Sequence, residues 1–332
     1  MEMSLSNVSS PIRHFREIPK LGLLGSATPV EPLTRLGAEL GAARLYIKRD
    51  DYSTYLVGGN KARKLEYSMA EVLRGKATAV ITVGSVQSNH ARITAMVARR
   101  LGLKCYLVLN GDLTARPTGN HLITKALGIE IIPVASRQDR LPAMEELAKD
   151  LERQGEIVAR IPLGASDAVG SFGLTAGMDE IIEQEKALGI RFDAIMVGSS
   201  SGGTQAGLEV GKRLFGRSDL RIIGVSPDDP AADIRKVVMR VGGQMLDKIG
   251  GAGLNEEDIE IDDAHIGEGY GIPSPASEEA ARLFARTEGI LLDPVYTSKV
   301  GAALIDACRQ GRFLPGQNVL FWHTGGLIGL FS

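Results

Sequence analysis

The chain has 332 residues, which is enough for two lobes or for one large domain with an insertion. Its composition, with 44% hydrophobic and 23% charged residues, is typical of a soluble globular protein. A net charge of -2 gives no overall field that favours nucleic acid or an anionic membrane, so we expect neither as a partner.

The cysteines, the histidines and the apolar runs indicate a cytoplasmic protein without a metal site. Cys105 and Cys308 lie far apart and form no CxxC pair, so a disulfide framework is not expected. The five histidines form no HxxxH or HExxH pattern, so we expect no bound metal. The N-terminus lacks an apolar signal core, and no apolar run reaches the length of a membrane span.

In chain order, residues 1 to about 20 resemble an irregular, partly polar arm. A proline-punctuated extended stretch follows at 28–33, and then come a short helix that ends at Leu40 and a strand at 44–48.

From there the pattern repeats strand, loop and helix. Short apolar runs predict strands at 79–83, 105–109, 129–134, 157–161, 194–197, 221–225 and 319–322. Helices are predicted from Lys61 onward and at 91–101, 119–127, 138–154, 173–188, 204–215, 231–249, 277–288 and 298–310. Alternation on this scale predicts an α/β fold in which helices wrap a mostly parallel sheet.

The first chemically informative stretch is GGNKARKLE at 58–66. Gly58 and Gly59 let the backbone turn, and Asn60 is expected to cap the helix that begins at Lys61. A lysine in the first turn lies beside the positive end of the helix dipole, which favours the neutral amine that a Schiff-base lysine needs. A solvated surface lysine is the alternative at this position.

The second stretch, GSSSGGTQAG at 198–207, follows a predicted buried strand and opens a helix. Small residues at a helix start let backbone N–H groups converge on an anion, so the loop is predicted to bind phosphate. It is neither a Walker A loop nor a GxGxxG dinucleotide loop, and a simple Gly/Ser turn is the alternative.

The third stretch is SVQSNH at 85–90, just before a predicted helix. Ser88 and Asn89 could cap that helix, or the turn could bind a substrate carboxylate with its N–H groups and hydroxyls. Either role leaves open whether His90 titrates.

These stretches occur in a fixed order with four others along the chain. The full series is KRDD at 48–51, GGNKARKLE at 58–66, SVQSNH at 85–90, SGGTQAG at 201–207, YGIP at 270–273, LDPVYT at 292–297 and HTGG at 323–326. The series resembles the family of 1-aminocyclopropane-1-carboxylate deaminase and D-cysteine desulfhydrase, and the similarity covers nearly the whole chain.

The resemblance implies pyridoxal 5'-phosphate as the cofactor and the two-lobed fold type II of tryptophan synthase β. Each lobe would be a mostly parallel twisted sheet wrapped by helices. Residues 1–62 and 172–332 would form the large cofactor-binding domain, and residues 63–171 a small inserted domain. The family also suggests a homodimer.

The resemblance further implies roles for individual residues. Lys61 would bind the cofactor as a Schiff base, the loop Ser201, Gly202, Gly203 and Thr204 would hold its phosphate with Lys64 nearby, and Asn89 would face the ring hydroxyl. Ser88, with Asn89 and His90, would bind the substrate. Ser88 would hold the carboxylate or help to move protons, and the freed Lys61 would be a proton-transfer candidate. Tyr270 and Tyr296 would be acid/base candidates, and Thr297 would face the pyridine nitrogen.

Two positions distinguish the subfamilies. The cyclopropane deaminases have Gln where this chain has His90 and Glu where it has Thr297, so the pattern resembles the desulfhydrases. A neutral threonine hydroxyl supports a weaker electron sink than a glutamate that keeps the pyridine nitrogen protonated. One departure is the segment 52–57, YSTYLV, where family members often read Leu-Thr-Gly-Leu, and it leaves the accepted amino acid open.

The sequence therefore predicts a pyridoxal-phosphate lyase that eliminates the β-substituent of a small amino acid, with D-cysteine as the first candidate. The products would be pyruvate, sulfide and ammonia. The alternatives are a 1-aminocyclopropane-1-carboxylate deaminase, an L-cysteate sulfo-lyase, and a catalytically silent homologue that only binds a metabolite.

Overall fold

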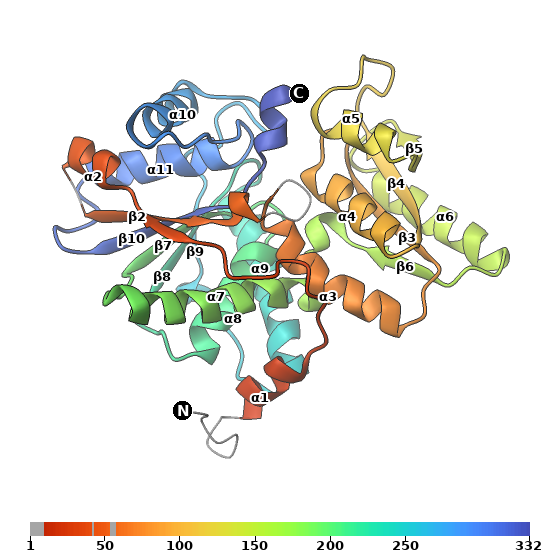
Figure 1. Cartoon of the computed structure of the whole chain (residues 1–332), viewed down its shortest axis with the longest axis horizontal. Helices are drawn as coiled ribbons and strands as arrows, with labels where there is room; N and C mark the ends of the chain where they lie inside the picture. The colour runs from red at the N-terminus through yellow and green to blue at the C-terminus, as the bar shows by residue number, and fades with distance from the viewer. Residues whose placement is uncertain (1–9, 42, 54–57) are drawn as a thin grey trace.

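A computed structural model describes residues 10–41, 43–53 and 58–332. Its helices and strands alternate through most of the chain, as the sequence pattern predicts (Figure 1). The strands are β1 (Val30–Pro32), β2 (Arg44–Arg49), β3 (Ala79–Ser85), β4 (Lys104–Asn110), β5 (Glu130–Val134), β6 (Val158–Ile161), β7 (Ala194–Gly198), β8 (Arg221–Val225), β9 (Glu260–Asp262) and β10 (Asn318–His323).

Helices connect these strands on both sides of the sheets. They are α1 (Ser10–Glu17), α2 (Thr34–Leu40), α3 (Lys61–Arg74), α4 (Asn89–Arg100), α5 (Gly119–Ala126), α6 (Arg140–Arg153), α7 (Ala168–Leu188), α8 (Gly203–Leu214), α9 (Ala231–Ile249), α10 (Pro275–Glu288) and α11 (Thr297–Arg309). Short 3-10 turns are η2 (Asp50–Tyr52), η3 (Leu163–Ala165), η4 (Glu256–Asp258) and η5 (Leu327–Phe331).

The strands form two separate sheets. The larger has the order β1-β2-β10-β7-β8-β9 and is parallel except for the antiparallel pair β1–β2. The smaller has the order β5-β4-β3-β6 and is parallel throughout. Because β2 and β10 are neighbours, the larger sheet joins the two ends of the chain, whereas the smaller sheet uses strands from 79 to 161 alone (Figure 1).

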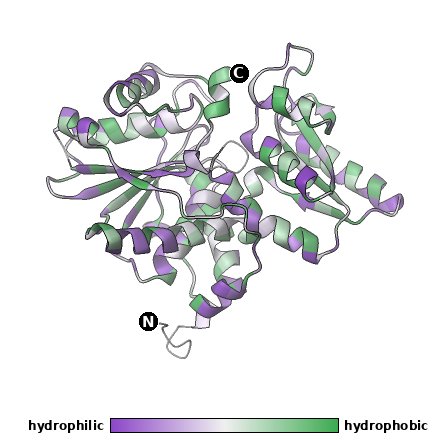
Figure 2. Cartoon of the chain, viewed as in Figure 1, coloured by the Kyte–Doolittle hydropathy of each residue, from purple (hydrophilic) through white to green (hydrophobic). Residues whose placement is uncertain are grey.

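Each sheet is covered by helices on both faces. In the larger sheet, apolar residues of α2, α10 and α11 pack on one face, and those of α7 and α8 pack on the other. In the smaller sheet, α3 and α4 cover one face and α6 covers the other. The helices carry hydrophobic and hydrophilic residues together, as expected for helices that bury one side against a sheet (Figure 2).

Two sequence expectations about the elements are wrong. Residues 10–17 are not part of an irregular arm but form α1, because Pro11 suits the start of a helix and Phe15 is buried beside Phe172, with ring centroids 5.9 Å apart. The strand β9 was not expected at all, since its sequence Glu260-Ile261-Asp262 has a single apolar residue. Residues 1–9 of the expected arm lie outside the described residues.

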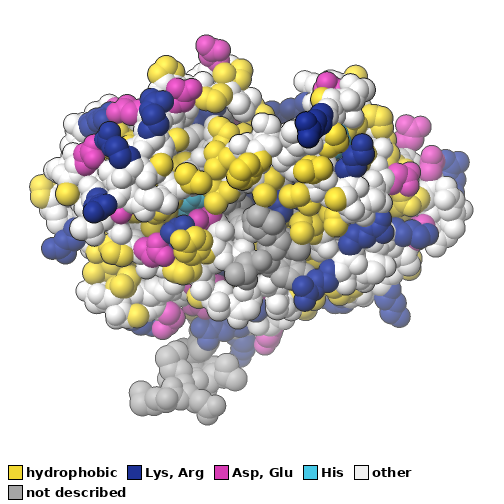
Figure 3. Space-filling view, turned by 45° about the horizontal axis from the view of Figure 1, so that its top comes forward, with side chains coloured by type: hydrophobic (Ala, Val, Ile, Leu, Met, Phe, Trp, Pro, Cys, Tyr) yellow, Lys and Arg dark blue, Asp and Glu magenta, His cyan; other side chains and the backbone are white. Residues whose placement is uncertain are grey.

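Some large apolar side chains stay on the surface. They include Leu291, Leu330 and Phe331, the last of which is 72% exposed. Hydrophobic side chains gather over the middle of the face that Figure 3 displays. Among the described residues, no helix is both long and apolar enough to span a membrane.

Candidate active site

The turn before α3 depends on its glycines. Gly58 and Gly59 have φ values of +74° and +108°, which side-chain-bearing residues rarely adopt. A Cβ on Gly58 would lie 2.3 Å from the carbonyl oxygen of Asp51, and one on Gly325 would lie 2.6 Å from Cα of Gly59. The expectation that glycines allow this turn is confirmed.

Asn60 does not cap α3 with its side chain, so that expectation is wrong. Its Nδ2 instead donates to Oγ1 of Thr204 at 3.0 Å, and its backbone N–H donates to the carbonyl of Thr324 at 3.1 Å. Asn60 therefore ties the lysine turn to the start of α8 and to the segment after β10.

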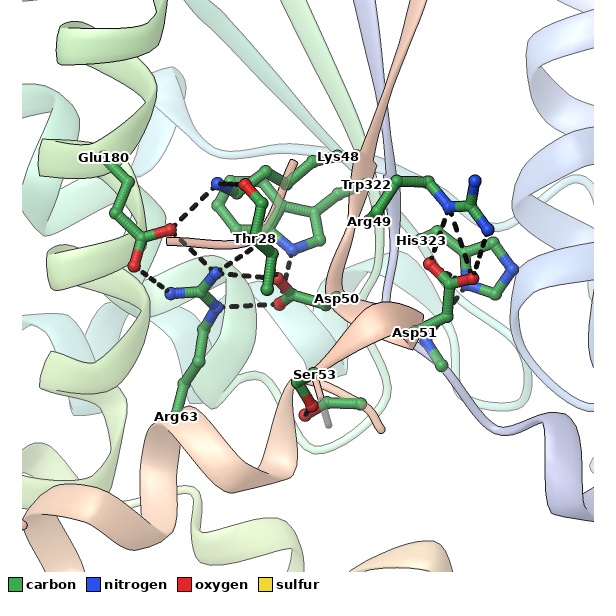
Figure 4. Close-up of polar contacts among 12 residues, drawn as sticks. Thr28, Lys48, Arg49, Asp50, Asp51, Ser53, Arg63, Glu180, Trp322 and His323 are labelled. Atoms are coloured by element: carbon green, nitrogen blue, oxygen red, sulfur yellow. Dashed lines mark hydrogen bonds and ion pairs between the residues drawn. The ribbon is translucent and has the colours of Figure 1, made fainter. Parts of the chain in front are cut away.

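A buried charge network fixes α3 against the larger sheet (Figure 4). The carboxylate of Asp50 accepts hydrogen bonds from the Arg63 guanidinium at 2.8 and 2.9 Å and from Nε1 of Trp322 at 2.8 Å. Glu180 on α7 pairs with both Arg63 and Lys48 at 2.8 Å. Since Arg63 is two residues after Lys61, the network holds the first turn of α3 in place.

Lys61 is the first residue of α3, and its side chain lines a cleft. It makes no hydrogen bond or ion pair with any residue that the structure describes. Burial lowers the pKa of its amine to about 8, and the nearby helix N-terminus also disfavours the charged form. At about pH 7, a pKa of about 8 leaves roughly a tenth of the amine neutral, which is far more than for an ordinary lysine.

The predicted phosphate loop joins β7 to α8. Gly202 has a φ of +71°, and a Cβ there would lie 2.6 Å from Cγ1 of Val237. A Cβ on Gly203 would lie 2.7 Å from Cα of Ser166. Ser201 and Thr204 line the cleft, while the two glycines shape the turn behind them. The first N–H groups of α8 have no acceptor within the helix, so they can serve an anion.

Lys64 connects to this loop through one serine. Its Nζ, which is fully buried, donates to Oγ of Ser166 at 2.9 Å, and that hydroxyl lies 2.7 Å from Oγ of Ser201. Burial, and then the nearby Lys61, lower the pKa of Lys64 well below its ordinary value. Across the described part of the chain, no carboxylate lies within 4.0 Å of either amine, so an anion bound here would meet no competing carboxylate and would favour the charged form of either amine.

The turn before α4 faces the same cleft. Ser88 is the N-cap of α4, and its Oγ accepts a hydrogen bond from the N–H of Ala91 at 3.2 Å. Oδ1 of Asn89 accepts from Nδ2 of Asn120 at 3.0 Å. Ser88 and Asn89 both line the cleft, so the predicted cap and a contact with a ligand are compatible.

His90 also lines the cleft, but its ring nitrogens are engaged elsewhere. Its Nε2 lies 2.8 Å from Oγ1 of Thr82, whose hydroxyl donates to the carbonyl of Ile161, so Nε2–H is the donor to Thr82. Nδ1 lies 3.5 Å from Oγ1 of Thr94. Burial, followed by Lys61 and Lys64, lowers the pKa of His90 well below its ordinary value, so the ring is neutral.

Tyr270 and Tyr296 lie together on another wall of the cleft. Their hydroxyl oxygens are 2.5 Å apart, and their ring centroids are 5.9 Å apart at a steep angle. Burial raises the pKa of Tyr270, and it raises that of Tyr296 well above its ordinary value. Both phenols are therefore protonated, and one donates to the other.

Thr297 is fully buried and does not line the cleft. Its hydroxyl donates to Oδ1 of Asp293 at 2.8 Å and accepts from the backbone N–H of Asp293 at 2.7 Å. The Asp293 carboxylate also accepts from the N–H groups of Val295, Tyr296 and Thr297, so Asp293 caps α11.

The cleft has a volume of about 280 Å³, and both sheets contribute to its walls. It brings together eight of the predicted site residues, namely Lys61, Ser88, Asn89, His90, Ser201, Thr204, Tyr270 and Tyr296. It also includes Ser200 of the predicted phosphate loop and four residues that the motifs did not reveal: Asn110, Arg137, Arg140 and Asp228. Asn110 ends β4, and Asp228 follows β8; the carboxyl ends of parallel strands were the available signal for these two.

These residues fit pyridoxal phosphate. Lys61 presents an amine that has no partner among the residues with described positions, at a pKa of about 8, as a carbonyl-binding lysine requires. The glycine cradle at 202–203 and the buried Lys64 amine suit a phosphate dianion. No group of three His, Cys, Asp or Glu side chains that could hold a metal ion occurs among the residues with described positions.

Comparisons with known proteins also point to pyridoxal phosphate as the cofactor. The family model described as pyridoxal-phosphate dependent enzyme matches residues 22–325. D-cysteine desulfhydrase of Salmonella typhi is 39% identical over 328 residues, which are 97% of this chain and 98% of that protein. The D-cysteine desulfhydrase of Salmonella newport (strain SL254) matches equally well.

Among solved structures, an ACC deaminase homologue has a TM-score of 0.90 and 34% identity, and the match covers 97% of this chain and 96% of that one. A pyridoxal 5'-phosphate-dependent aspartate racemase, at 17% identity and a TM-score of 0.66, shares the fold. The predicted fold class, resemblance and cofactor are thereby confirmed. The chain belongs to the family of pyridoxal-phosphate-dependent enzymes.

Proposed function

We propose that the protein is a lyase that eliminates the β-substituent of a small amino acid, with D-cysteine as its substrate and pyruvate, sulfide and ammonia as products. The observation that carries the proposal is the meeting of the Lys61 amine with the hydrogen-bonded pair Tyr270 and Tyr296 in one cleft. Elimination needs a base for the Cα proton and an acid near the leaving group, and this set supplies both. The 39% identity to D-cysteine desulfhydrases supports the choice of substrate.

The cofactor would be held at both of its ends. Lys61 would bind its carbonyl carbon, and Asn89 would face its ring hydroxyl. Thr297 does not line the cleft itself, but it follows the cleft-lining Tyr296 and would lie on the side of the pyridine nitrogen. Its phosphate would contact Ser201, Gly202, Gly203 and Thr204, with Lys64 acting through Ser166. When bound, pyridoxal phosphate supplies an electron sink for the electron pair released at Cα.

The chain's own residues would bind the substrate and move its protons. Ser88 and Asn89, at the N-terminus of α4, would hold the carboxylate, and the neutral His90 would pack beside them. The Lys61 amine, whose pKa burial lowers to about 8, would take the Cα proton in its neutral form. Tyr296 would give its proton to the departing sulfur and regain one through Tyr270.

The experiment is an assay of the purified holoenzyme for pyruvate, sulfide and ammonium from D-cysteine, with L-cysteine, L-cysteate and 1-aminocyclopropane-1-carboxylate as parallel substrates. Pyruvate and sulfide from D-cysteine support the proposal. Release of 2-oxobutyrate from the cyclopropane substrate with little elimination identifies a deaminase, which the similarity to the ACC deaminase homologue makes the second candidate. Sulfite from L-cysteate identifies a sulfo-lyase, and no turnover identifies a silent binding protein.

We also propose the coarser organisation that the family suggests. Residues 1–62 and 172–332 would form the large domain and residues 63–171 the small one; the confinement of the smaller sheet to strands from 79 to 161 supports this division. The enzyme would be a homodimer, supported by exposed apolar residues such as Leu330 and Phe331, and light scattering after size exclusion tests this. Two free, buried cysteines suit a reducing cytoplasm.

A further inference from the structure

Arg140 is a buried cation without a carboxylate partner. It is the first residue of α6, lines the cleft and is 8% exposed. Its Nε donates to Oδ1 of Asn110 at 2.7 Å, and its Nη2 donates to the same oxygen. Among the described residues, no Asp or Glu oxygen lies within 4.0 Å of its guanidinium. A neutral amide oxygen is a weak counterpart for a buried charge, which normally has an anionic partner.

Its neighbour Arg137 differs in this respect. Arg137 lies 3.6 Å from Asp228 and 3.3 Å from Asp229, and half of its side chain is exposed. Protein carboxylates and solvent therefore already balance the Arg137 charge. Arg140 keeps its charge at physiological pH because a guanidinium does not lose its proton there.

Arg140 takes no part in the hydrogen bonds of the two anion sites described above. Lys64, Ser166 and Ser201 connect the phosphate loop through hydrogen bonds that do not involve Arg140. The N-terminus of α4 is the site proposed for the substrate carboxylate. Arg140 instead lines the cleft together with the hydrogen-bonded pair Tyr270 and Tyr296.

We propose that Arg140 binds a negatively charged β-substituent of the substrate. The inference rests on the proposed β-elimination and adds a substrate class to it: alanines whose β-group is an anion, such as a thiolate or a sulfonate. Arg140 is then a specificity residue that also stabilises the leaving group as it departs.

The chemistry balances with this role. Elimination breaks the Cα–H and Cβ–S bonds, and the C–H electron pair forms the Cα=Cβ bond. The C–S pair leaves with sulfur, as sulfite from a sulfonate, or as hydrogensulfide from a thiolate that takes the proton of Tyr296. The Cα proton passes to the base, and water hydrolyses 2-aminoacrylate to pyruvate and ammonium. A guanidinium next to the sulfur stabilises the negative charge that the leaving group carries away.

The first test compares two non-reactive ligands by calorimetric titration of the holoenzyme. In 3-sulfopropanoate a sulfonate occupies the β-position of a carboxylic acid, and in butanoate a methyl group does. The wild type is expected to bind 3-sulfopropanoate roughly tenfold more tightly or better, since charge-assisted hydrogen bonds have that strength. Arg140→Gln should reduce the preference to about onefold, and Arg140→Lys should keep part of it.

The matched control is Arg137→Gln, which removes a nearby cation already paired with Asp228 and Asp229 and should keep the preference. The proposal is overturned if only Arg137→Gln loses the preference. It is also overturned if Arg140→Gln loses affinity for both ligands equally. A wild type without preference overturns it as well, a result that needs no variant to fold.

The second test uses turnover. For Arg140→Gln, kcat/KM should fall roughly tenfold more with cysteate than with 3-chloroalanine, and most of the loss should lie in KM. Equal losses with both substrates assign Arg140 to the α-carboxylate and overturn the inference. If neither substrate reacts even with the wild type, the D-cysteine assay decides whether the proposed lyase activity stands, while the titration still decides the role of Arg140.

Discussion

Lys61 and Lys64 are one helical turn apart, and both amines are withdrawn from solvent, yet their surroundings differ. Lys64 has the Ser166 hydroxyl as a partner, whereas Lys61 has none among the described residues. The amine without a partner is the more available nucleophile. This difference assigns the covalent cofactor attachment to Lys61 rather than Lys64.

Borohydride reduction of the holoenzyme should therefore fix the mass of the cofactor on the peptide that contains Lys61, as read by mass spectrometry. Lys61→Ala should lose the label and the visible absorbance, while Lys125→Ala, on the surface of α5, should keep both. Label found on Lys64 or Lys48 would contradict the assignment.

Thr297 stabilises the start of α11 through two hydrogen bonds to Asp293. Thr297→Val should leave the Asp293 N–H and one carboxylate position without partners, which costs about 1–3 kcal/mol of the free energy of unfolding. Urea denaturation measures this loss. Thr297→Ser should retain most of the stability, and Thr287→Val, which loses a single bond to a helix carbonyl, should cost less. Equal losses at 297 and 287 would contradict the argument.

Glu209 on α8 is a buried carboxyl. Within the described part of the chain, its Oε1 has no hydrogen-bond partner, and neither has Oε1 of Gln205 one turn earlier. Burial raises the pKa of Glu209 from 4.5 to about 8. A protonated Glu209 could donate to Gln205, so one proton satisfies two acceptors.

Because the folded state holds this proton more tightly, folding takes it up between the two pKa values, and stability falls as pH rises from 4.5 to about 8. Glu209→Gln removes the titration, so its stability relative to wild type should improve as the pH is raised. Urea midpoints at about pH 5 and about pH 9 test this. A constant difference between the two proteins would show that Glu209 titrates normally.

At single residues, local backbone features were predictable from the sequence, whereas contacts between distant residues were not. The lysine turn was predictable because a positive φ favours glycine, so the pair Gly58 and Gly59 indicates a turn from the sequence alone. The contact of Asn60 with Thr204 was not predictable, since 144 positions separate the two residues. An Asn directly before a helix is equally consistent with a side-chain cap. No sequence pattern indicated a role for Arg140, because its significance comes from the absence of carboxylates near it among the described residues.

At the scale of elements, the lysine-bearing helix depends on a buried carboxylate. Asp50 is fully buried, and although burial alone would raise its pKa, Arg63 holds that pKa below the ordinary value. Asp50→Asn should leave part of the Arg63 charge unbalanced and cost about 3–5 kcal/mol, as breaking a buried ion pair does. Chemical denaturation, with the cofactor content of the purified protein as a second reading, measures the effect.

The matched control is Asp233→Asn, which breaks the exposed pair with Lys236 and should cost less than about 1 kcal/mol. If Asp50→Asn is no more destabilising than this control, the network does not support α3.

Elements with strong periodicity were predictable, and weak ones were not. The helix at 231–249 has the predicted bounds because apolar residues recur along it and Pro230 and Gly250 mark its ends. The strand β9 owes its existence to pairing with β8, a tertiary contact that three residues of sequence do not encode.

At the scale of the whole molecule, the alternation of strands and helices predicted the class of fold, but the division into two sheets needed the resemblance. The sequences of β2 and β10 do not indicate that these two strands pair, and the strands lie near opposite ends of the chain. The cleft follows from that pairing: α3 starts beside the joined ends, and the first turn of α4 faces it from the smaller sheet.

Because residues from both sheets line this cleft, the cofactor should link the stabilities of the two parts. A ligand that binds only the folded state at about 100 times its Kd adds roughly 2.7 kcal/mol. Removing the cofactor with hydroxylamine should therefore lower the Tm by several degrees, as measured by calorimetry, and adding it back should restore the Tm.

From the phosphate loop and Lys64 we expect that the phosphate group of the cofactor contributes part of that stabilisation, separately from the ring and its bond to Lys61. Pyridoxal, which lacks the phosphate, should restore less of the Tm than pyridoxal phosphate, because the buried Lys64 amine and the N-terminus of α8 then remain without an anion. Lys61→Ala should still gain stability from pyridoxal phosphate, since the phosphate contacts survive the loss of the covalent bond. If pyridoxal restores the Tm as fully as the phosphorylated form, the stabilisation comes from the ring and Lys61 alone, and the loop at 201–204 does not hold the phosphate.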